Sequence, residues 1–563
     1  LKIVPPAWRR LVQPAPGQLD RRAYTLCVLE QLREALKRHD VFVMKSKHWT
    51  DTSAQLLKGS AWKAARPHVC RMLRISPKAE EELSLLRLEL DETYRQTAAH
   101  FPKNEAIRVE SRDGRDALVL TPLEALDEPR SLLELREDVA ALLPQVDLPD
   151  VLLEVDAWTG FTREFTHVSE GSSRVQDLAI SVSAVLIAQA CNLGLAPLVR
   201  ADIPALTRGR LSWIDQAYFR GETIRAANAC LVDHQATIPL AQQWGGGDVA
   251  SVDGIRFVVP VRTINAGPNP HYYGPKRGVT LLNVATDQFT GFNGPVVPGT
   301  LRDSIYILAA LLQNETKLRP VQIMTDTASY SDLVCGLFRL LGYRFCPRLA
   351  DLGGARLWRI DRTADYGPLN SVSRHRIDTD RIATHWDDIL RVAGSLVSGT
   401  VPPDELIRSL QGGGKPTTLG RAIAEYGRIP KTIHLLNLID DEAYRRQILV
   451  QLNRHEARHS LARLTFHGKK GELRQPYREG QEDQLGALGL VVNAIVLWNT
   501  RYIDLALDHL RAEGMVVRVE DVERLSPLGH EHINLHGRYY FGLPEAIQRG
   551  DLRRLRDPGE QDL

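Results

Sequence analysis

The sequence predicts a mixed α/β protein, and three observations support this fold class. Hydrophobic residues make up 43% of the 563 residues and charged residues 25%, as in an ordinary globular protein, which excludes a disordered, collagen-like or fibrous chain. Short apolar, β-branched runs alternate with helical patterns between Val249 and Cys346. Apolar residues recur at helical spacing on both sides of that stretch. The length allows roughly three or four domains.

The first 244 residues are expected to be mainly helical. Leucines recur at helical spacing, for example Leu83, Leu86 and Leu90. Short apolar runs on both sides of Asp113-Gly114 predict one hairpin, because Asp-Gly favours the tight turn between two antiparallel strands. The predicted helices cover residues 22–40, 79–100, 131–143 and 175–190.

Five strands and two helices are predicted in the central stretch, in the order three strands, helix, strand, helix, strand. Thr300 and Asp303 open the first helix, and Ser329 or Ser331 caps the second, since hydroxyl and carboxylate side chains accept hydrogen bonds from free N–H groups at a helix start. The strands are expected at residues 249–259, 279–285, 288–297, 320–325 and 343–346.

These elements divide the chain into six predicted regions. A mainly helical scaffold with a small hairpin comes first, and a helical region then leads into the core domain. A helical insertion separates the two parts of the core domain, and the second part contains a long helix at about 440–466. A C-terminal extension follows. The boundaries are 1–155, 156–244, 245–351, 352–445, 446–515 and 516–563.

The net charge of +2 excludes nothing about partners, but charge is unevenly distributed. Residues 1–50 hold ten Lys/Arg and four Asp/Glu, whereas residues 80–154 hold eight and nineteen. Six scattered cysteines without a C-x-x-C pair argue against a disulfide scaffold and fit a reducing compartment. The uncharged stretch 179–199 is too polar for a bilayer core, so we expect a buried helix and no membrane partner.

Three carboxylates are the candidate metal ligands. Asp253 lies in the first predicted strand and Asp326 ends the fourth, and neighbouring strand ends in an open sheet converge on one edge, where ligands bind. Glu456, in the predicted long helix, is the best placed third carboxylate. Mg²⁺ prefers oxygen ligands and keeps several waters, so three carboxylates suffice. A pair of such ions can activate a nucleophile and stabilise a leaving oxygen in phosphoryl transfer.

The surroundings of Glu456 are basic. Seven Lys/Arg and two Glu lie between Arg454 and Arg478, which suits contacts with a phosphate backbone, although a solvated helix face is the alternative. Lys276 and Arg277 follow two tyrosines and could bind DNA by charge and stacking, or belong to a simple exposed hairpin. The candidate DNA contacts are Arg454, Arg458, Arg463, Lys469, Lys470, Lys276 and Arg277.

The predicted helix around Glu456 is expected to be amphipathic. One polar face holds Glu456, His459, Arg463 and His467. The apolar face, which should pack on the core, holds Ala457, Leu461 and Leu464.

Several segments resemble motifs of the transposases of the replicative Tn3 family of bacterial transposons. Ser251–Phe257 looks like the first-aspartate motif, Ile323–Asp332 resembles the second, and Leu452–His459 resembles the motif that carries the catalytic glutamate. The two aspartates are 73 residues apart and the glutamate follows 130 residues later, as expected for this family. The resemblance extends over most of the chain. Further similar segments are Pro298–Ser304, Phe345–Asp351 and Val492–Thr500.

The resemblance implies an RNase H-like catalytic core with a helical insertion, preceded by a mainly helical region. It implies that Asp253, Asp326 and Glu456 are the catalytic residues and hold two Mg²⁺ ions, for which Mn²⁺ is a substitute. The implied reaction is hydrolysis at the transposon ends, which frees a 3′-OH, followed by attack of that 3′-OH on target DNA, with a cointegrate as the product of replicative transposition.

The resemblance also implies partners and a location. The partner is double-stranded DNA, as terminal inverted repeats and as target, and the active form is at least a dimer because two ends are joined. The implied location is the bacterial cytoplasm, with association to the nucleoid when the protein is on DNA.

Two other functions remain open. The chain could be a catalytically incomplete fragment that binds DNA and assembles with partners but lacks the parts that find transposon ends. Alternatively, His455 to His459 reads H-E-x-x-H, in which two histidines at i and i+4 bind zinc and the glutamate is the base of a metallopeptidase, with Glu479 or Glu482 as a third ligand. The basic flank and the two aspartates that this leaves without a role argue against the peptidase.

The start and the length indicate a fragment. The chain begins with Leu1 rather than Met, and 252 residues precede Asp253, which is room for about two domains of the usual size. Members of the resembled family are much longer, with several domains ahead of the catalytic core. We therefore expect the C-terminal portion of a larger transposase.

Overall fold

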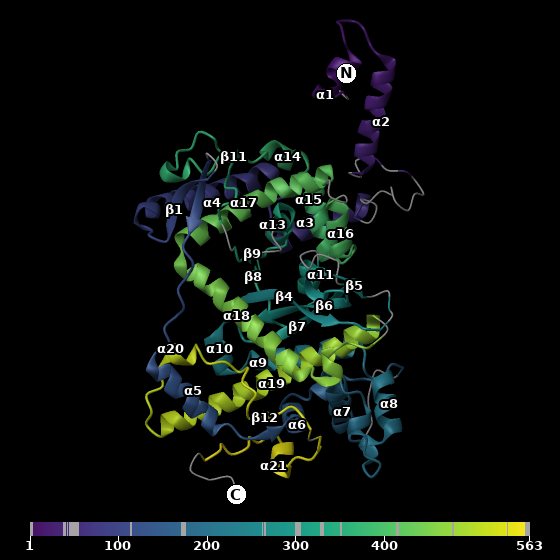
Figure 1. Cartoon of the computed structure of the whole chain (residues 1–563), viewed down its shortest axis with the longest axis vertical. Coiled ribbons are helices and arrows are strands. Elements are labelled where there is room, and N and C mark those ends of the chain that lie inside the picture. The colour runs from purple at the N-terminus through teal and green to yellow at the C-terminus, as the bar shows by residue number, and fades with distance from the viewer. Residues whose placement is uncertain are drawn as a thin grey trace. The chain divides into compact units, whose positions relative to one another are not determined.

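The computed structural model divides the chain into two compact units (Figure 1). The first unit comprises residues 1–121, 330–345 and 351–442, and the second comprises residues 122–329, 346–350 and 443–563. Each unit therefore combines segments that lie far apart in the sequence. The structure describes residues 4–37, 41, 43, 56–112, 115–169, 176–261, 263, 266–298, 306–312, 314–326, 331–349, 352–411, 416–475, 478–537 and 539–557.

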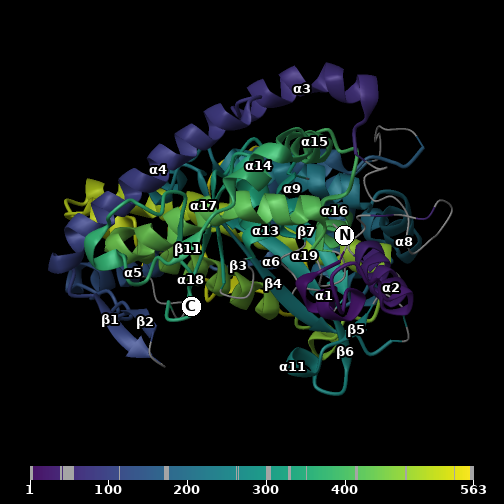
Figure 2. The same cartoon turned by 90° about the horizontal axis from the view of Figure 1, so that it is seen from above.

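The first unit is mainly helical. Its longer elements are α1 (Pro6–Val12), α2 (Arg21–Lys37), α3 (Gly59–Leu73), α4 (Ala79–His100), β1 (Ile107–Arg112), β2 (Arg115–Leu120), α13 (Asp332–Leu340), α14 (Thr379–Thr384), α15 (Trp386–Val397), α16 (Pro403–Gln411) and α17 (Thr418–Asp440). α17 packs against α13 and α4, and α15 packs against α3. α3 and α4 follow one another along one side of this unit (Figure 2).

The predicted helices and hairpin of this unit are confirmed. The helices expected at residues 22–40 and 79–100 correspond to α2 and α4. β1 and β2 pair antiparallel from Ile107 opposite Leu120 to Arg112 opposite Arg115. The predicted turn residues Asp113-Gly114 lie outside the described residues.

Two glycines let α13 and α17 pack backbone against backbone. A Cβ atom at Gly427 would lie 1.8 Å from the carbonyl oxygen of Asp332, and one at Gly336 would lie 2.5 Å from the carbonyl oxygen of Ile423. Both distances are far below van der Waals contact, so any side chain here would force the two helices apart.

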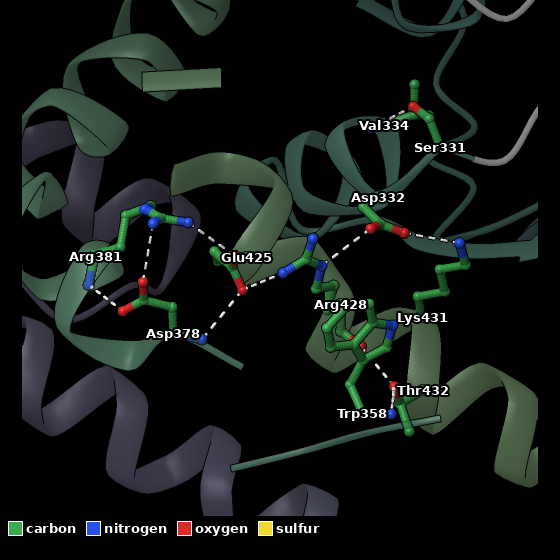
Figure 3. A network of polar contacts seen from close by, with 10 residues as sticks. All are labelled: Ser331, Asp332, Val334, Trp358, Asp378, Arg381, Glu425, Arg428, Lys431 and Thr432. Atoms are coloured by element: carbon green, nitrogen blue, oxygen red, sulfur yellow. Dashed lines mark hydrogen bonds and ion pairs between the residues drawn. The ribbon is translucent and has the colours of Figure 1, made fainter. Parts of the chain in front are cut away.

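A network of charged side chains joins the same two helices (Figure 3). The Asp332 carboxylate accepts hydrogen bonds from Arg428 Nε at 3.1 Å and from Lys431 Nζ at 2.7 Å. Arg428 also forms an ion pair with Glu425 and lies over the ring of Trp358, with its guanidinium carbon 3.9 Å from the ring centroid. These contacts fix the first turn of α13 on α17.

The second unit is built around a six-stranded mixed sheet. Its strands are β4 (Val249–Val258), β5 (Gly267–Pro268), β6 (Arg277–Thr286), β7 (Gly291–Pro298), β8 (Gln322–Thr325) and β9 (Arg344–Pro347). The order across the sheet is β5-β6-β4-β8-β9, and β7 pairs with β6. β4 is antiparallel to β6 and parallel to β8, and β7 is antiparallel to β6.

The predicted order of elements in the central stretch is confirmed. β4, β6 and β7 are followed by α12 (Ile307–Leu312), β8, α13 and β9. The predicted helix start at Thr300 and Asp303 and the predicted cap Ser329 lie outside the described residues. Ser331, the alternative cap, accepts a hydrogen bond from the backbone N–H of Val334 at 3.2 Å.

Helices surround the sheet of the second unit. They are α5 (Arg130–Leu142), α6 (Leu148–Thr159), α7 (Leu178–Ala190), α8 (Arg208–Ala217), α9 (Gly221–Gln235), α10 (Pro239–Trp244), α11 (Pro270–Tyr273), α12, α18 (Glu442–Thr465), α19 (Arg478–Ala512), α20 (Val519–Val522) and α21 (Glu545–Gln548). α19 packs against α6, α7 and α9, and its residues 490–498 are fully buried.

Two apolar helices of this unit are core helices. The segment Gly480–Ala512 of α19 is long and apolar enough to cross a membrane, yet 83% of its most apolar stretch is buried inside the protein. α7 occupies the first part of the uncharged stretch 179–199 and is buried, as expected, although it ends at Ala190 and is therefore shorter than predicted.

Candidate active site

Strand register brings Asp253 and Asp326 to the same edge of the sheet. β4 and β8 run parallel, and their last paired residues are Val252 and Thr325. Asp253 and Asp326 are the next residues along these two neighbouring strands, and because side chains alternate between the faces of a sheet, both point to the face opposite that of Val252 and Thr325. The two strands that carry the aspartates are therefore neighbours, as expected, although Asp253 lies inside β4 and only Asp326 follows a strand end.

The electrostatic surroundings of Asp253 connect it with the other two carboxylates. Its Oδ1 accepts a hydrogen bond from the backbone N–H of Gly254 at 2.7 Å, and its Oδ2 lies 3.6 Å from Nδ1 of His459. Burial is the main cause that raises the pKa of Asp253, the Gly254 hydrogen bond partly offsets it, and the charges of Asp326 and Glu456 raise the pKa further. Asp326 and Glu456 therefore lie near enough to Asp253 for their charges to act on it.

α18 and the residue that follows it contact β4 from Ser251 to Phe257. Glu456 follows the buried His455 and is itself exposed, and its charge acts on Asp253. The contacts are Gln451 Nε2 to Ser251 Oγ at 3.1 Å, His455 Nδ1 with Ser251 Oγ at 2.8 Å, His459 Nδ1 with Asp253 Oδ2 at 3.6 Å, and Phe466 on Phe257 with ring centroids 4.9 Å apart.

The carboxylates share a neighbourhood but do not close around a common point. Among the residues that the structure describes, no three His, Cys, Asp or Glu side chains lie close enough together to hold one metal ion. Asp326 and Glu456 are exposed, whereas Asp253 is half-buried.

The buried face of α18 is polar, which contradicts the predicted amphipathic pattern. His455, Arg458 and His459 are 1%, 2% and 3% exposed, whereas Leu464 is 41% exposed and Ala457 is also exposed. The expectation is confirmed for Leu461, which is 2% exposed, and wrong for Ala457 and Leu464, because hydrogen bonds to β4 and its neighbours bring polar side chains onto the inward face.

The same orientation argues against a zinc peptidase. His455 and His459 point into the interface with the sheet, with ring centroids 4.5 Å apart, while Glu456 lies on the exposed side. Burial lowers the pKa of both histidines, that of His459 to about 3, so both rings are neutral. An H-E-x-x-H zinc site needs both histidines and the glutamate to face one open cleft.

The region that contains the three carboxylates matches a known protein family. The sequence profile described as "Tn3 transposase DDE domain" matches residues 150–539, which is more than half of the chain. The chain belongs to the Tn3 transposase DDE domain family.

Similar curated proteins are transposases that are longer than this chain. The transposase for transposon gamma-delta of Escherichia coli (strain K12) is 52% identical over 553 residues, which cover 98% of this chain and 55% of that protein. The transposase for transposon Tn4556 of Streptomyces fradiae is 52% identical over 560 residues, which cover 99% of this chain and 62% of that protein. The transposase for transposon Tn501 of Pseudomonas aeruginosa is 36% identical, with 99% and 56% covered. The chain thus spans 55–62% of these relatives.

One of the basic residues predicted to contact DNA is a buried anchor in this Tn3-family chain. Arg458 donates hydrogen bonds to the carbonyl oxygen of Phe289 at 3.0 Å and to Oδ1 of Asn493 at 2.6 Å. Burial lowers its pKa to about 9. Since its guanidinium is enclosed by protein, the predicted DNA contact of Arg458 is wrong.

The other basic candidates differ in exposure. Arg454 is half-buried, and its Nη1 donates to the carbonyl oxygens of Asp287 at 2.8 Å and Trp244 at 3.2 Å. Lys276 forms an ion pair with Glu472 at 3.3 Å. Side chains that remain accessible to DNA on this family member are those of Arg463, Lys469, Lys470, Lys276 and Arg277.

Three buried polar residues around the aspartates escaped the sequence reasoning. Ser251 and Gln451 form the hydrogen bonds between β4 and α18, and Asn283 lies opposite Asp253 on β6. A signal existed for Asn283, because it is a single amide in an otherwise apolar strand segment, Leu281–Ala285. Single polar residues in buried strands are unusual enough to mark a site.

Proposed function

We propose that this chain is the catalytic portion of a DNA transposase, which cleaves a strand at each transposon end to free a 3′-OH and joins that 3′-OH to target DNA in replicative transposition. Asp253, Asp326 and Glu456 are its proposed catalytic and metal-binding residues. The observation that supports this proposal is the parallel register of β4 and β8, in which Asp253, within β4, is next to the position of Asp326 just after β8. Membership of the DDE domain family supports the reaction class.

The proposed core is RNase H-like. Three antiparallel strands, β4, β6 and β7, are followed by β8, which is parallel to β4, and by β9 at the sheet edge. The helices α14–α17 come between β9 and α18 in the chain, which is the place that the sequence predicts for a helical insertion. Both features support this fold.

The residues present fit divalent metal ions. All three carboxylates offer the hard oxygen atoms that Mg²⁺ and Mn²⁺ prefer. The pKa of Asp253 is raised by burial and by Asp326 and Glu456, so the charged form is disfavoured and a nearby cation would offset that cost. We propose that two such ions bind here, held by these three residues.

Each proposed residue has a distinct part. Bound divalent ions would activate the attacking water or 3′-OH and stabilise the leaving oxygen. Asp253 has a fixed orientation, because Gly254 N–H holds one oxygen and His459 lies beside the other. Glu456 is exposed on α18, where DNA can reach it. Arg463, on the same helix, then places positive charge near the phosphate backbone.

The proposed partners follow from the reaction. Double-stranded DNA would serve both as terminal inverted repeats and as target, and joining two ends requires at least two copies of the protein. The proposed place of action is the bacterial cytoplasm, on the nucleoid. Because the chain spans only part of its relatives, recognition of the ends is proposed for the longer protein as a whole.

Strand transfer with pre-cleaved ends tests the function. In Mg²⁺ or Mn²⁺, the wild-type chain should join a labelled 3′-OH end to target DNA, and Asp253→Asn, Asp326→Asn and Glu456→Gln should each lower the rate at least about 1,000-fold. Asp508→Asn, which removes an exposed carboxylate from α19, is the matched control and should react normally. Joining by Asp253→Asn at the wild-type rate would refute the assignment.

The assembly-fragment alternative predicts a different result. A chain without catalytic activity would bind end-containing duplex DNA but would join no strands with either metal ion, even when the end is already cleaved. The pre-cleaved substrate separates the two functions, because it removes the need for end recognition before cleavage.

A further inference from the structure

Asn283 is the neighbour of Asp253 across the sheet. The two residues lie directly opposite one another in the antiparallel pairing of β4 and β6. Directly opposite residues point to the same face, with their Cβ atoms about 4.5–5.5 Å apart. Asn283 therefore lies on the face that α18 covers, and Asp326, Asp253 and Asn283 form one row across β8, β4 and β6.

The carboxamide of Asn283 is buried and incompletely satisfied. The residue is 7% exposed, and its Oδ1 accepts no hydrogen bond from the part of the chain that the structure describes. A buried acceptor without a partner costs stability, and a leucine of nearly equal size would avoid this cost. Leu282 and Val284, the adjacent residues on β6, are apolar and buried. A polar side chain at this one position indicates a ligand that supplies the missing donor.

The strand pairing is irregular at the same place. The register between β6 and β7 shifts between Leu281 and Asn283. A Cβ atom at Gly294 on β7 would lie 2.4 Å from the carbonyl oxygen of Leu282, so the two strands approach unusually closely at the irregularity. Such irregularities redirect side chains and are frequent beside active sites.

We propose that Asn283 is a positioning residue of the metal site, whose carboxamide oxygen accepts a hydrogen bond from a water molecule carried by the divalent cation at Asp253. This inference rests on the function proposed above. The missing partner must be a hydrogen-bond donor, which excludes a phosphate oxygen. Mg²⁺ keeps several of its waters in protein sites, and metal-bound waters are strong donors. Groups that hold such outer ligands change metal affinity by about 10- to 100-fold.

Metal binding to the full chain tests this inference without any catalytic reaction. Mn²⁺ is titrated into the protein, and the unbound ion is quantified by its electron paramagnetic resonance signal. Asn283→Leu and Asn283→Ala should weaken Mn²⁺ binding about 10-fold or more, whereas Asn283→Asp, which keeps the acceptor and adds charge, should bind at least as tightly as the wild type. Thr280→Val removes a buried hydroxyl from the opposite face of β6 and should leave the affinity unchanged.

Wild-type affinity in both Asn283→Leu and Asn283→Ala would overturn the inference. The alanine variant introduces no larger group, so it gives an answer even when the leucine variant does not fold. Asp253→Asn distinguishes failure of the proposed role of Asn283 from failure of the proposed function. Loss of Mn²⁺ binding in Asp253→Asn together with normal binding in both Asn283 variants would leave the proposed function intact and remove only the role of Asn283. Wild-type binding by Asp253→Asn would overturn both.

Discussion

Asp287 shows how burial, rather than pairing with an opposite charge, determines the ionisation of a carboxyl group in this chain. Burial raises its pKa to about 6, and the charge of Arg454 and hydrogen bonds from the backbone N–H groups of Gly247 and Val249 only partly offset the effect. A Cβ atom at Gly245 would lie 2.2 Å from Oδ2 of Asp287, so the carboxyl group is enclosed by backbone. The residue lies in the turn between β6 and β7.

The raised pKa of Asp287 predicts a pH-dependent stability. Because its pKa in the folded chain lies above its ordinary value of 3.8, folding favours the protonated form, and the stabilisation is lost as the pH rises to about 6. About 2 pKa units correspond to roughly 3 kcal/mol. Asp287→Asn keeps an acceptor for Gly247 N–H and should remove this loss. Denaturant unfolding at pH 4.5 and pH 7 measures it, with Asp508→Asn as the exposed control, and an unchanged pH profile in Asp287→Asn would contradict the prediction.

Arg458 and Lys469 predict opposite effects of removing a positive charge. Arg458→Gln should lower the free energy of unfolding by about 3 kcal/mol, because buried acceptors lose their donor, while the salt dependence of DNA binding stays the same. Lys469→Gln should leave stability unchanged and reduce the slope of log affinity against log salt by about 1. The two variants are compared by thermal unfolding and by DNA titration at several salt concentrations. If Arg458→Gln also reduces the slope of log affinity against log salt, Arg458 is a DNA contact after all.

At the scale of single residues, the position of a side chain could be predicted where it follows from the local pattern of strands and helices. The closeness of Asp253 and Asp326 was predictable because one lies in a predicted strand and the other ends a predicted strand, and these two strands are neighbours. The burial of Arg458 was not predictable, because it depends on acceptors from the turn between β6 and β7 and from α19, which are distant in the chain. A basic segment in the sequence does not distinguish an enclosed guanidinium from an accessible one.

At the scale of elements, the contact between α13 and α17 depends on the absence of two side chains. Gly336 and Gly427 face one another's backbones, and Asp332 links the same helices through charged contacts. Steric fit and ion pairing thus act at one place. Such a contact tolerates no increase in volume, because the obstructing atoms are backbone atoms that cannot rotate away.

Gly427→Ala should destabilise the first unit. The new methyl group would meet the carbonyl oxygen of Asp332, and we expect a decrease of about 3 kcal/mol in the free energy of unfolding. Gly209→Ala in α8, where no atom lies within 4 Å of the added carbon, is the matched control and should be neutral or stabilising by about 0.5–1 kcal/mol. Denaturant unfolding followed by circular dichroism gives both values, and equal stability of the two variants would contradict the steric argument.

The order of elements was predictable, but the inward face of α18 was not. Alternating and helical periodicities identified β4, β6, β7, β8 and β9 and the helices between them. For α18 the periodicity was right for Leu461 but wrong for Ala457 and Leu464, which are exposed, and it gave no sign that His455 and His459 are buried. Periodicity reports apolar burial, and this helix is held against the sheet by hydrogen bonds instead.

At the scale of the whole molecule, the C-terminal segment is attached to the core of its unit through one buried carboxylate. Glu154 on α6 is 0% exposed and accepts hydrogen bonds from Trp498 Nε1 at 3.0 Å and from the Tyr502 hydroxyl at 2.9 Å. Arg553, beyond the last helix, forms an ion pair with Glu154 and a second with Asp150 at 3.2 Å. The segment around Arg553 is therefore part of the folded unit.

Arg553→Gln should destabilise the second unit by about 3–5 kcal/mol, because it leaves the Glu154 carboxylate buried without a cation. Arg549→Gln, four residues earlier and exposed, should have no measurable effect. Thermal unfolding and limited proteolysis of the C-terminal segment check both variants. If Arg553→Gln is as stable as Arg549→Gln, the C-terminal segment is not needed for the fold.

The division into two units depends on contacts between segments that are distant in the sequence, and the sequence pattern does not reveal such contacts. Residues 352–442, most of the predicted helical insertion, belong to the same compact unit as residues 1–121. The sequence pattern indicated helices in both segments but gave no partner for either, because helical periodicity identifies an apolar face without identifying what covers it. The predicted domain boundaries therefore stay predictions.

The series of contacts between α18 and β4 has a consequence for how chains of this kind can change in length. One residue inserted between Gln451 and Phe466 would turn every later contact by about 100° around the helix, and Glu456 would leave the edge where the aspartates lie whenever the insertion preceded it. A single substitution disturbs one contact, whereas a single insertion disturbs the whole series. Insertions and deletions should therefore accumulate in loops before α18, while the interval from Gln451 to Phe466 keeps its length.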